Sequence, residues 1–155
     1  MEHHHHEPGG DAAALIERAE RRCGEAGRLF TPLRRRVFAE LARSGSLGAY
    51  DLVERLGQER RIAPISVYRA LDFLIEAGLI HRIAARNTYL PCHGDHDHDR
   101  GDATVFLVCT QCGNVDELSS ATVARELQGA AAAVGFAPLS RSVEVEGECS
   151  ACRTQ

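Results

Sequence analysis

The C-terminal third of the chain contains four cysteines in two pairs whose spacing is typical of zinc ligands. Cys109 and Cys112 form the first pair, and Cys149 and Cys152 form the second. In each Cys-x-x-Cys pair a tight turn places two thiolates on one side, so two pairs can supply a tetrahedral shell of four sulfur ligands. Such a shell has no open position for water or substrate. We therefore predict a structural zinc site, in preference to two separate redox dithiols or buried apolar cysteines.

A second cluster of possible ligands lies between the middle of the chain and these pairs. The stretch "CHGDHDHD" occupies residues 92–99. The candidate ligands in and around it are Cys92, His93, Asp95, His96, Asp97, His98 and Asp99, with His81 before it and Glu117 after it. A thiolate combined with imidazoles and a carboxylate suits zinc better than iron(II), manganese or magnesium, because sulfur is a soft donor. A mixed shell binds less firmly than four thiolates, as a reversible sensor requires. The alternative for the histidines is a solvated charged loop.

The residues before this cluster carry the pattern of helices followed by a hairpin. Asp11 is placed to cap the first helix, whose apolar side includes Cys23, and Thr31 with Pro32 begins the second. Two short strands are predicted within residues 79–90. The four predicted helical segments are 11–27, 31–45, 48–58 and 63–78. Short helices followed by a hairpin describe a winged helix-turn-helix.

The residues after the hairpin predict a second, smaller folding unit. A strand should lead into the first cysteine pair, a second strand should follow at "NVDEL", a helix should end near Gly135, and a third strand should precede the second pair. So few residues bury little core, and units of this size commonly need a metal or a partner chain. The fold class is therefore α+β. We expect a flexible His-containing tail over 1–10, a winged-helix domain over 11–91, a metal-sensing hinge loop over 92–102 and an α/β domain over 103–155. The tail is either an added tag or a native, loosely metal-binding extension.

Charge divides the chain in the same place. The formal net charge is −4 and all 18 basic residues are Arg. Residues 11–91 hold 14 Arg and 10 acidic residues, whereas residues 92–155 hold 4 Arg and 10 acidic residues. The first part can therefore meet phosphate, and the second can hold cations.

The fourth predicted helix has the pattern of a DNA recognition helix. Val67, Leu71 and Leu74 lie along its core side, and Ser66 and Arg69 fall on the other side near its start. Arg can read guanine through two hydrogen bonds, and further Arg side chains can neutralise phosphates. The phosphate-contact candidates are Arg34, Arg35, Arg36, Arg82 and Arg86. The alternative is an ordinary solvated Arg-rich surface.

Several function classes are not expected. The N-terminus lacks an apolar export signal, and no run approaches the roughly 18 to 20 apolar residues of a membrane span. We therefore expect a cytoplasmic protein, in which metal binding is the leading explanation for the six cysteines and a disulfide framework is not expected. A zinc-dependent hydrolase or deaminase would need an open metal position and an H-x-E motif, and the only H-x-E stands in the tail at His5-His6-Glu7. We do not expect an enzyme.

Four segments together resemble the ferric uptake regulator family of metal-dependent repressors, over roughly residues 15–152. They are "TPLRRRVFAEL", "AYDLVERL", "SVYRALDFLIEAGLIHR" and "CTQCGNVDEL…CSAC". The AYDL and YRALDFL segments, and a cysteine directly after the wing, are similar to the zinc uptake regulator branch. This resemblance implies an N-terminal winged helix that binds DNA, a C-terminal dimerisation domain, and a metal at the hinge that sets the angle between them.

The resemblance also implies roles for individual residues. Cys109, Cys112, Cys149 and Cys152 match the structural zinc site, and His81, Cys92 and Glu117 match the regulatory zinc site, with His98 as the favoured fourth ligand and His96 as the alternative. Tyr50 and Arg69 match base-contacting positions, Tyr68 is expected near the DNA backbone, and Ser66 stands where Thr is usual. Iron and peroxide sensors of the family carry a histidine-rich run before the first knuckle cysteine, and "DATVFLVC" has none.

These implications combine into one expected function. The chain is predicted to be a zinc-responsive transcriptional repressor that binds palindromic operator DNA as a zinc-loaded homodimer and controls zinc uptake genes. It should hold one structural and one regulatory zinc ion per subunit, with neither a membrane partner nor a small-molecule substrate. The expected DNA contacts are Tyr50, Ser66, Tyr68, Arg69, Arg34 and Arg82. An iron- or manganese-responsive repressor of the same family is the alternative.

Overall fold

The computed structural model describes residues 3–4, 12–59, 61–93 and 101–153. The chain forms two compact units, one over Glu7–His93 and one over Gly94–Gln155 together with Met1–His6. The division falls within the segment that the sequence predicts as a hinge. Helices and sheets are mixed in the fold, as predicted. No helix in these ranges has the length and apolar content needed to span a bilayer.

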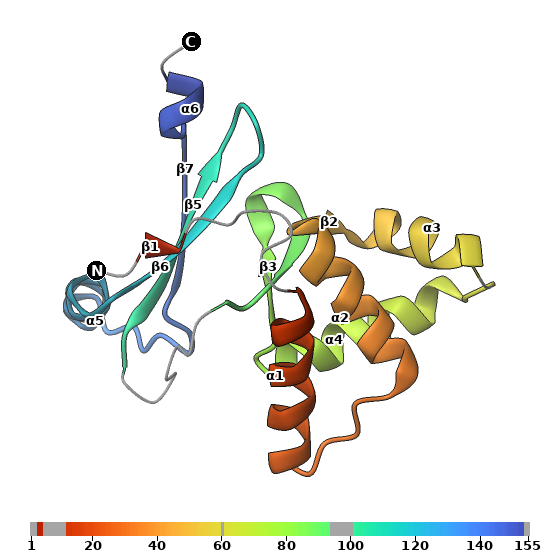
Figure 1. The fold of residues 1–155 in the computed structure, drawn as a ribbon. Helices are drawn as coiled ribbons and strands as arrows, with labels where there is room; N and C mark the ends of the chain where they lie inside the picture. Colours follow the sequence, from red (N-terminus) through yellow and green to blue (C-terminus); the bar gives the residue numbers. More distant parts are fainter. Residues whose placement is uncertain (1–2, 5–11, 60, 94–100, 154–155) are drawn as a thin grey trace. The chain divides into compact units, whose positions relative to one another are not determined.

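The N-terminal unit is the predicted winged helix-turn-helix (Figure 1). Its elements are α1 (Ala12–Glu25), α2 (Pro32–Ser44), β2 (Leu47–Gly48), α3 (Ala49–Glu59), α4 (Pro64–Glu76), β3 (Ile80–Ile83) and β4 (Thr88–Pro91). The strands form a sheet of order β2-β4-β3, in which β3 and β4 are the wing. The sequence did not predict β2, because two residues are too few to show an alternating pattern.

Local signals place the ends of these elements. The Thr31 hydroxyl accepts a hydrogen bond from the Arg34 backbone N–H at 3.3 Å, and Pro32 occupies the first helical position of α2. Gly45 ends α2 at φ 82°, where a side chain would be strained. In the wing turn Asn87 takes the left-handed conformation, with φ 51°, which Asn tolerates better than most residues. These ends agree with those predicted.

The core of this unit is built from the apolar sides of its four helices. Its most completely buried members include Val37, Phe38, Leu41, Leu52, Val67, Leu71 and Leu74. Cys23 joins this core from α1, as predicted, and burial raises the pKa of its thiol although Arg28, Arg34 and Arg22 lower it. Cys23 is therefore a packing residue and not a metal ligand.

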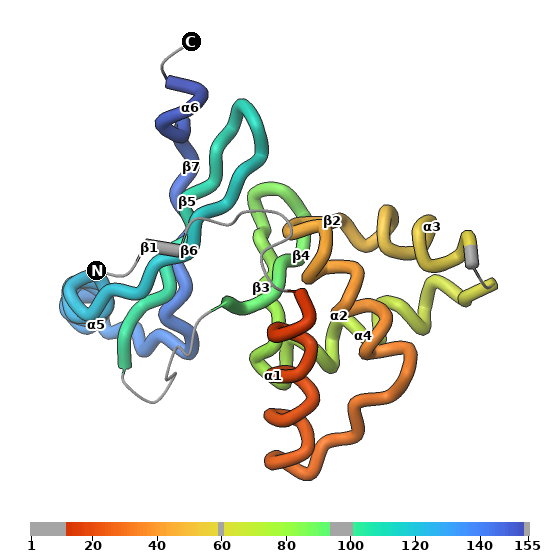
Figure 2. The backbone as a smooth tube through the Cα atoms, in the orientation of Figure 1, coloured from red at the N-terminus to blue at the C-terminus, as the bar shows by residue number. Residues whose placement is uncertain are grey.

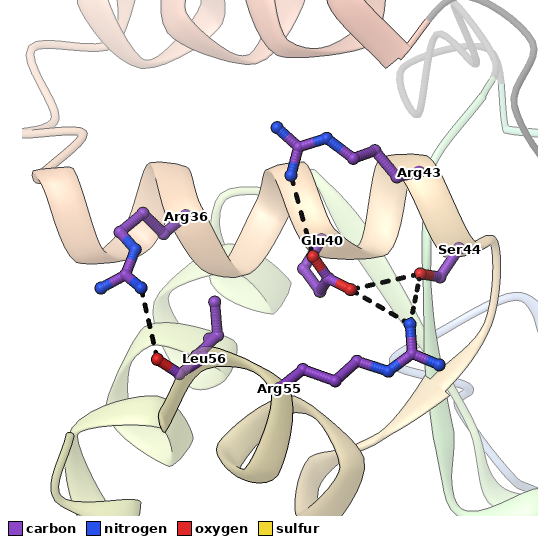
Figure 3. A network of polar contacts seen from close by, with 6 residues as sticks. All are labelled: Arg36, Glu40, Arg43, Ser44, Arg55 and Leu56. Atoms are coloured by element: carbon purple, nitrogen blue, oxygen red, sulfur yellow. Dashed lines mark hydrogen bonds and ion pairs between the residues drawn. The ribbon is translucent and has the colours of Figure 1, made fainter. Parts of the chain in front are cut away.

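The run Arg34-Arg35-Arg36 contacts three neighbouring helices. Successive helical residues point about 100° apart, so the three side chains leave α2 in different directions. The Arg34 guanidinium carbon lies 3.5 Å from the centre of the Phe73 ring of α4, and Arg35 pairs with the Glu20 carboxylate of α1 at 2.5 Å. Arg36 donates to the Leu56 carbonyl of α3 at 3.3 Å (Figure 3). The run that the sequence assigned to phosphate contacts thus ties α2 to the rest of its own unit.

Glu40 anchors a second link between α2 and α3. Its carboxylate lies 3.1 Å from the Arg55 guanidinium and 3.7 Å from that of Arg43. Arg55 also donates a hydrogen bond to the Ser44 hydroxyl at 2.9 Å (Figure 3). The Glu40 side chain is only 20% exposed, so this ion pair is less screened by solvent than a pair on an open surface.

The Glu40–Arg55 pair should contribute measurably to stability. We expect Glu40→Ala and Arg55→Ala each to lower the free energy of unfolding, with a coupling energy of roughly 0.5–1 kcal/mol in a double-mutant cycle. Urea unfolding followed by circular dichroism measures it. The matched control is Arg125–Glu126, whose side chains are 73% and 75% exposed at 3.6 Å. Equal coupling in the two cycles would contradict the prediction.

The C-terminal unit is an α/β unit, whose backbone Figure 2 traces from β5 to α6. Its sheet has the order β1-β6-β5-β7, in which β1 is the two-residue strand His3–His4. Its elements are β5 (Ala103–Cys109), β6 (Val115–Ser120), α5 (Ala121–Ala133), β7 (Ser142–Gly147) and α6 (Ser150–Arg153). β5 pairs antiparallel with β6 and parallel with β7. The three predicted strands and the helix are confirmed, whereas the four-residue α6 and the two-residue β1 were not predicted.

A short strand within the tail differs from the sequence prediction. β1 (His3–His4) pairs antiparallel with β6, where His3 opposes Leu118 and His4 opposes Glu117. The sequence predicted no regular element there, because the segment has no apolar periodicity. An edge strand such as β6 offers unpaired backbone groups that can pair with any extended segment, whatever its side chains. The rest of the tail lies outside the described residues.

Candidate metal centres and DNA-facing residues

Parallel pairing of β5 with β7 brings the two cysteine pairs to one end of the sheet. Cys109 is the last residue of β5 and lies opposite Gly147, the last residue of β7. The second pair begins two residues later, at Cys149. Because parallel strands run in the same direction, both pairs follow the carboxyl ends of their strands. A separation of 36 residues in the sequence therefore becomes a short distance in space.

Tight turns then direct the sulfurs toward one another. In the first pair the Gly113 backbone N–H donates to the Cys109 carbonyl at 3.0 Å, with Gly113 at φ 78°. In the second pair the Cys152 N–H donates to the Cys149 carbonyl at 3.1 Å, at the start of α6. Each pair therefore presents its two thiols from a closed turn, as the spacing predicts.

The four sulfurs have the separations of a tetrahedral zinc shell. All four Sγ atoms lie within 4.8 Å of one another, and those of Cys112 and Cys149 are 3.7 Å apart. Four sulfurs at about 2.3 Å from a central zinc ion would be about 3.8 Å apart. The structure thus brings together all four predicted ligands of the structural site, in a geometry that fits the ion.

The thiols of Cys109 and Cys152 differ in pKa. Backbone N–H groups, first that of Cys112 and then that of Cys149, lower the pKa of Cys109 to about 6. Hydrogen bonds with the side chains of Cys149 and Cys112 raise the pKa of Cys152 to about 12. The protein alone therefore favours the thiolate form at Cys109 and disfavours it at Cys152. Only a cation among the sulfurs would favour four thiolates.

Two candidates for the regulatory site lie on the wing. His81 is on β3 opposite Leu90 of β4, and the Cys92 N–H continues this ladder by donating to the Leu79 carbonyl at 2.9 Å. Leu90 and Cys92 are two residues apart, so the side chains of His81 and Cys92 lie on the same face of the wing.

Arg18 of α1 holds the backbone of this segment in place. Its guanidinium donates to the carbonyls of Cys92 and His93, at 3.0 Å for His93. No sequence pattern predicts this role, because Arg18 is more than 70 residues away along the chain. Cys92 itself is buried, with 2% of its surface exposed.

The remaining candidates for the regulatory site are divided between β6 and the segment after the wing. Glu117 lies on β6 opposite Phe106 and is 5% exposed. Burying a carboxylate is unfavourable unless a cation or hydrogen-bond donor accompanies it, so its position is typical of a ligand or an ion-pair partner. His93 is half-buried. The other predicted loop ligands, Asp95, His96, Asp97, His98 and Asp99, lie outside the described residues.

The expected base-reading residues are exposed on α3 and α4. Tyr50 on α3 and Tyr68 on α4 are 77% and 45% exposed, Arg69 is exposed and Ser66 is half-buried. On the wing, the Arg82 guanidinium donates to Asn87 Oδ1 at 3.0 Å and remains at the surface. Each of these side chains therefore has surface that a bound DNA could contact.

Comparisons with known proteins agree with this arrangement. The model of the ferric uptake regulator family matches residues 25–146. The zinc uptake regulation protein of Escherichia coli (strain K12) is 35% identical over 140 residues, which cover 89% of this chain and 81% of that protein.

Two solved structures are also similar over most of the chain. A zinc uptake regulator complexed with zinc and DNA has a TM-score of 0.84 and 32% identity, covering 94% of this chain and 97% of that one. Holo XcZur has a TM-score of 0.81 and 34% identity, covering 92% of this chain and 99% of that one.

Proposed function

The chain belongs to the ferric uptake regulator family, and we propose that it is a zinc-responsive transcriptional repressor that controls zinc uptake genes. The observation that carries the proposal is the presence in one chain of a winged helix with exposed base-reading candidates and a four-cysteine cluster of zinc-shell dimensions. Similarity to a regulator solved with both zinc and DNA supports it. The protein would bind palindromic operator DNA as a homodimer, without catalysing a reaction.

The structural metal site would be formed by Cys109, Cys112, Cys149 and Cys152. Zinc, when bound there, supplies a cross-link between chain segments. The residues themselves close the turns after β5 and β7, so that the sheet of a small unit is held at its end. Four thiolates leave no ligand position for substrate, which agrees with a structural role.

The regulatory site would use His81, Cys92, His98 and Glu117, with His96 as the alternative to His98. One thiolate, two imidazoles and one carboxylate are donors that zinc accepts, and the mixed set binds less tightly than four thiolates. These residues come from both units of the chain. A zinc ion bound by all four would limit the motion of the winged helices in a dimer and favour the spacing of two half-sites in a palindrome.

The DNA-binding surface would be α4 together with α3 and the wing. Arg69 is suited to a bidentate contact with guanine in the major groove, and Tyr50, Ser66 and Tyr68 would lie beside it. Arg82 would contact phosphate. Arg34, whose guanidinium stacks on Phe73 of α4, would also contact phosphate while it holds α4 against α2.

The proposed dimer is supported by apolar side chains that the C-terminal unit leaves exposed. The large ones are Leu107, Val134, Phe136, Leu139 and Val145, which range from 39% exposed to fully exposed. A second copy of this chain that packs against these side chains would remove them from water. One recognition helix per subunit then matches one half-site.

Arg69→Ala should weaken operator binding without loss of zinc. The expected cost is roughly 1–3 kcal/mol, because a bidentate base contact is removed. Fluorescence anisotropy with operator and unrelated duplexes measures binding, and a chelator dye measures zinc. Arg125→Ala, at an exposed position of α5, is the matched control and should leave both unchanged. A loss of the same size on unrelated DNA would show that Arg69 contacts only phosphate.

Metal-specific DNA binding tests the function itself. The purified protein is titrated onto an operator duplex in buffers that fix free zinc, iron(II) or manganese(II). Zinc alone should promote binding, and by linkage the operator should raise zinc affinity by the same factor. Binding driven by iron(II) or manganese(II) would move the protein to another branch of the family.

A further inference from the structure

We infer that Ile65 reads the C5 methyl group of a thymine in the operator. This inference rests on the proposed function and adds a specificity-determining residue to it. It starts from an apolar side chain that the fold leaves in solvent on the helix that would enter the major groove. Ile65 is 57% exposed.

The position of Ile65 on α4 directs its side chain away from the protein. Val67, Leu71 and Leu74 are buried and define the core side of the helix. At about 100° per residue, Ile65 lies roughly 180° from Leu74. Pro64 begins α4, so Ile65 is in the first turn, and recognition helices contact base edges with their N-terminal residues.

Ile65 shares this outward side with the expected base readers. Tyr68 and Arg69 follow it by three and four residues, the spacing of neighbours on one helical surface, and both are exposed. In an α-helix, four residues correspond to about 6 Å along the axis, whereas base pairs are about 3.4 Å apart. A base contacted by Ile65 would therefore lie within about two base pairs of the guanine contacted by Arg69.

The chemistry of the side chain restricts what it can recognise. Ile carries neither a donor nor an acceptor, so it can bind neither a phosphate oxygen nor the polar edge of a base. The apolar feature that distinguishes one base in the major groove is the thymine methyl group. Covering one such methyl group removes about as much apolar surface from water as burying one methylene, which corresponds to about a fourfold change in affinity.

Deoxyuridine provides a test, because it removes the methyl group and keeps base pairing. A duplex is first selected from a randomised pool with the zinc-loaded protein, and each thymine is then replaced by deoxyuridine in turn. We expect one thymine per half-site to give about a fourfold loss of affinity, and about a fifteenfold loss when both half-sites are changed.

Variants then assign that loss to one side chain. Ile65→Ala changes both subunits, so it should bind the unmodified duplex as weakly as the wild type binds the duplex with deoxyuridine in both half-sites. Its affinity should no longer change when thymine is replaced by deoxyuridine. Ile65→Val, which keeps two methyl groups, should retain part of the response. Ile75→Ala is the matched control, since Ile75 is 38% exposed near the other end of α4, and it should respond as the wild type does.

Three results would overturn the inference, and the third is distinguishable from the first two. If every thymine tolerates deoxyuridine, or if Ile65→Ala keeps the full response, Ile65 does not read a methyl group although the protein remains a zinc-dependent repressor. If zinc-loaded protein selects no duplex at all, the proposed function fails, and this inference fails with it.

Discussion

Replacement of Cys152 by serine is expected to remove one zinc ion per subunit and to destabilise the C-terminal unit. The hydroxyl is a poor zinc ligand beside three thiolates, and the shell that joins the ends of β5 and β7 would open. Structural zinc sites have binding free energies of roughly 10–16 kcal/mol, and this binding contributes to folding, so a loss of several kcal/mol in stability is expected. Zinc content measures the loss of metal, and thermal unfolding measures the loss of stability.

Two comparisons make this result specific. Chelation of zinc from the wild-type protein should reproduce the loss of stability, because protein and chelator compete for the same ion. Cys23→Ala removes a buried thiol that belongs to the α1 core, so it should lower stability and keep the zinc content. A Cys152→Ser protein with unchanged zinc content would show that the four sulfurs do not form the site.

Replacement of Cys92 by serine should abolish zinc-activated DNA binding in a protein that still folds. Serine has nearly the shape of cysteine and retains the backbone N–H that donates to the Leu79 carbonyl, so the wing should persist. The regulatory ion would lose its one sulfur ligand. The advantage that zinc gives to operator binding, roughly 5- to 150-fold for a coupling of 1–3 kcal/mol, should disappear. Zinc-buffered anisotropy titrations of operator binding measure it.

The neighbouring histidine supplies the control for this experiment. His93 adjoins Cys92 but is outside the proposed ligand set, so His93→Ala should keep both zinc ions and zinc-activated binding. Cys92→Ser should keep only the structural ion. If Cys92→Ser fails to fold, or if it retains two zinc ions per subunit, the assignment of separate structural and regulatory sites is wrong.

Much of the fold follows from local signals in the sequence. Thr31, Pro32 and Gly45 place the ends of α2 because a cap, a restricted φ and a positive φ act within a few residues. Apolar periodicity identified the core side of α4, because the helix itself determines which residues share a face. The two Cys-x-x-Cys turns were equally readable, since each forms within four residues.

What the sequence did not provide is which distant residues meet. Only the parallel register of β5 and β7 shows how the two cysteine pairs come together, because backbone pairing between strands depends on the whole sheet. Only the packing of helices gives Arg34, Arg35 and Arg36 their three separate partners, which composition could not distinguish from phosphate contacts. The sequence by itself determined the helices, the wing and the ligand types, because these depend on neighbours along the chain. The tertiary structure decided where each charge and each sulfur points, because that depends on neighbours in space.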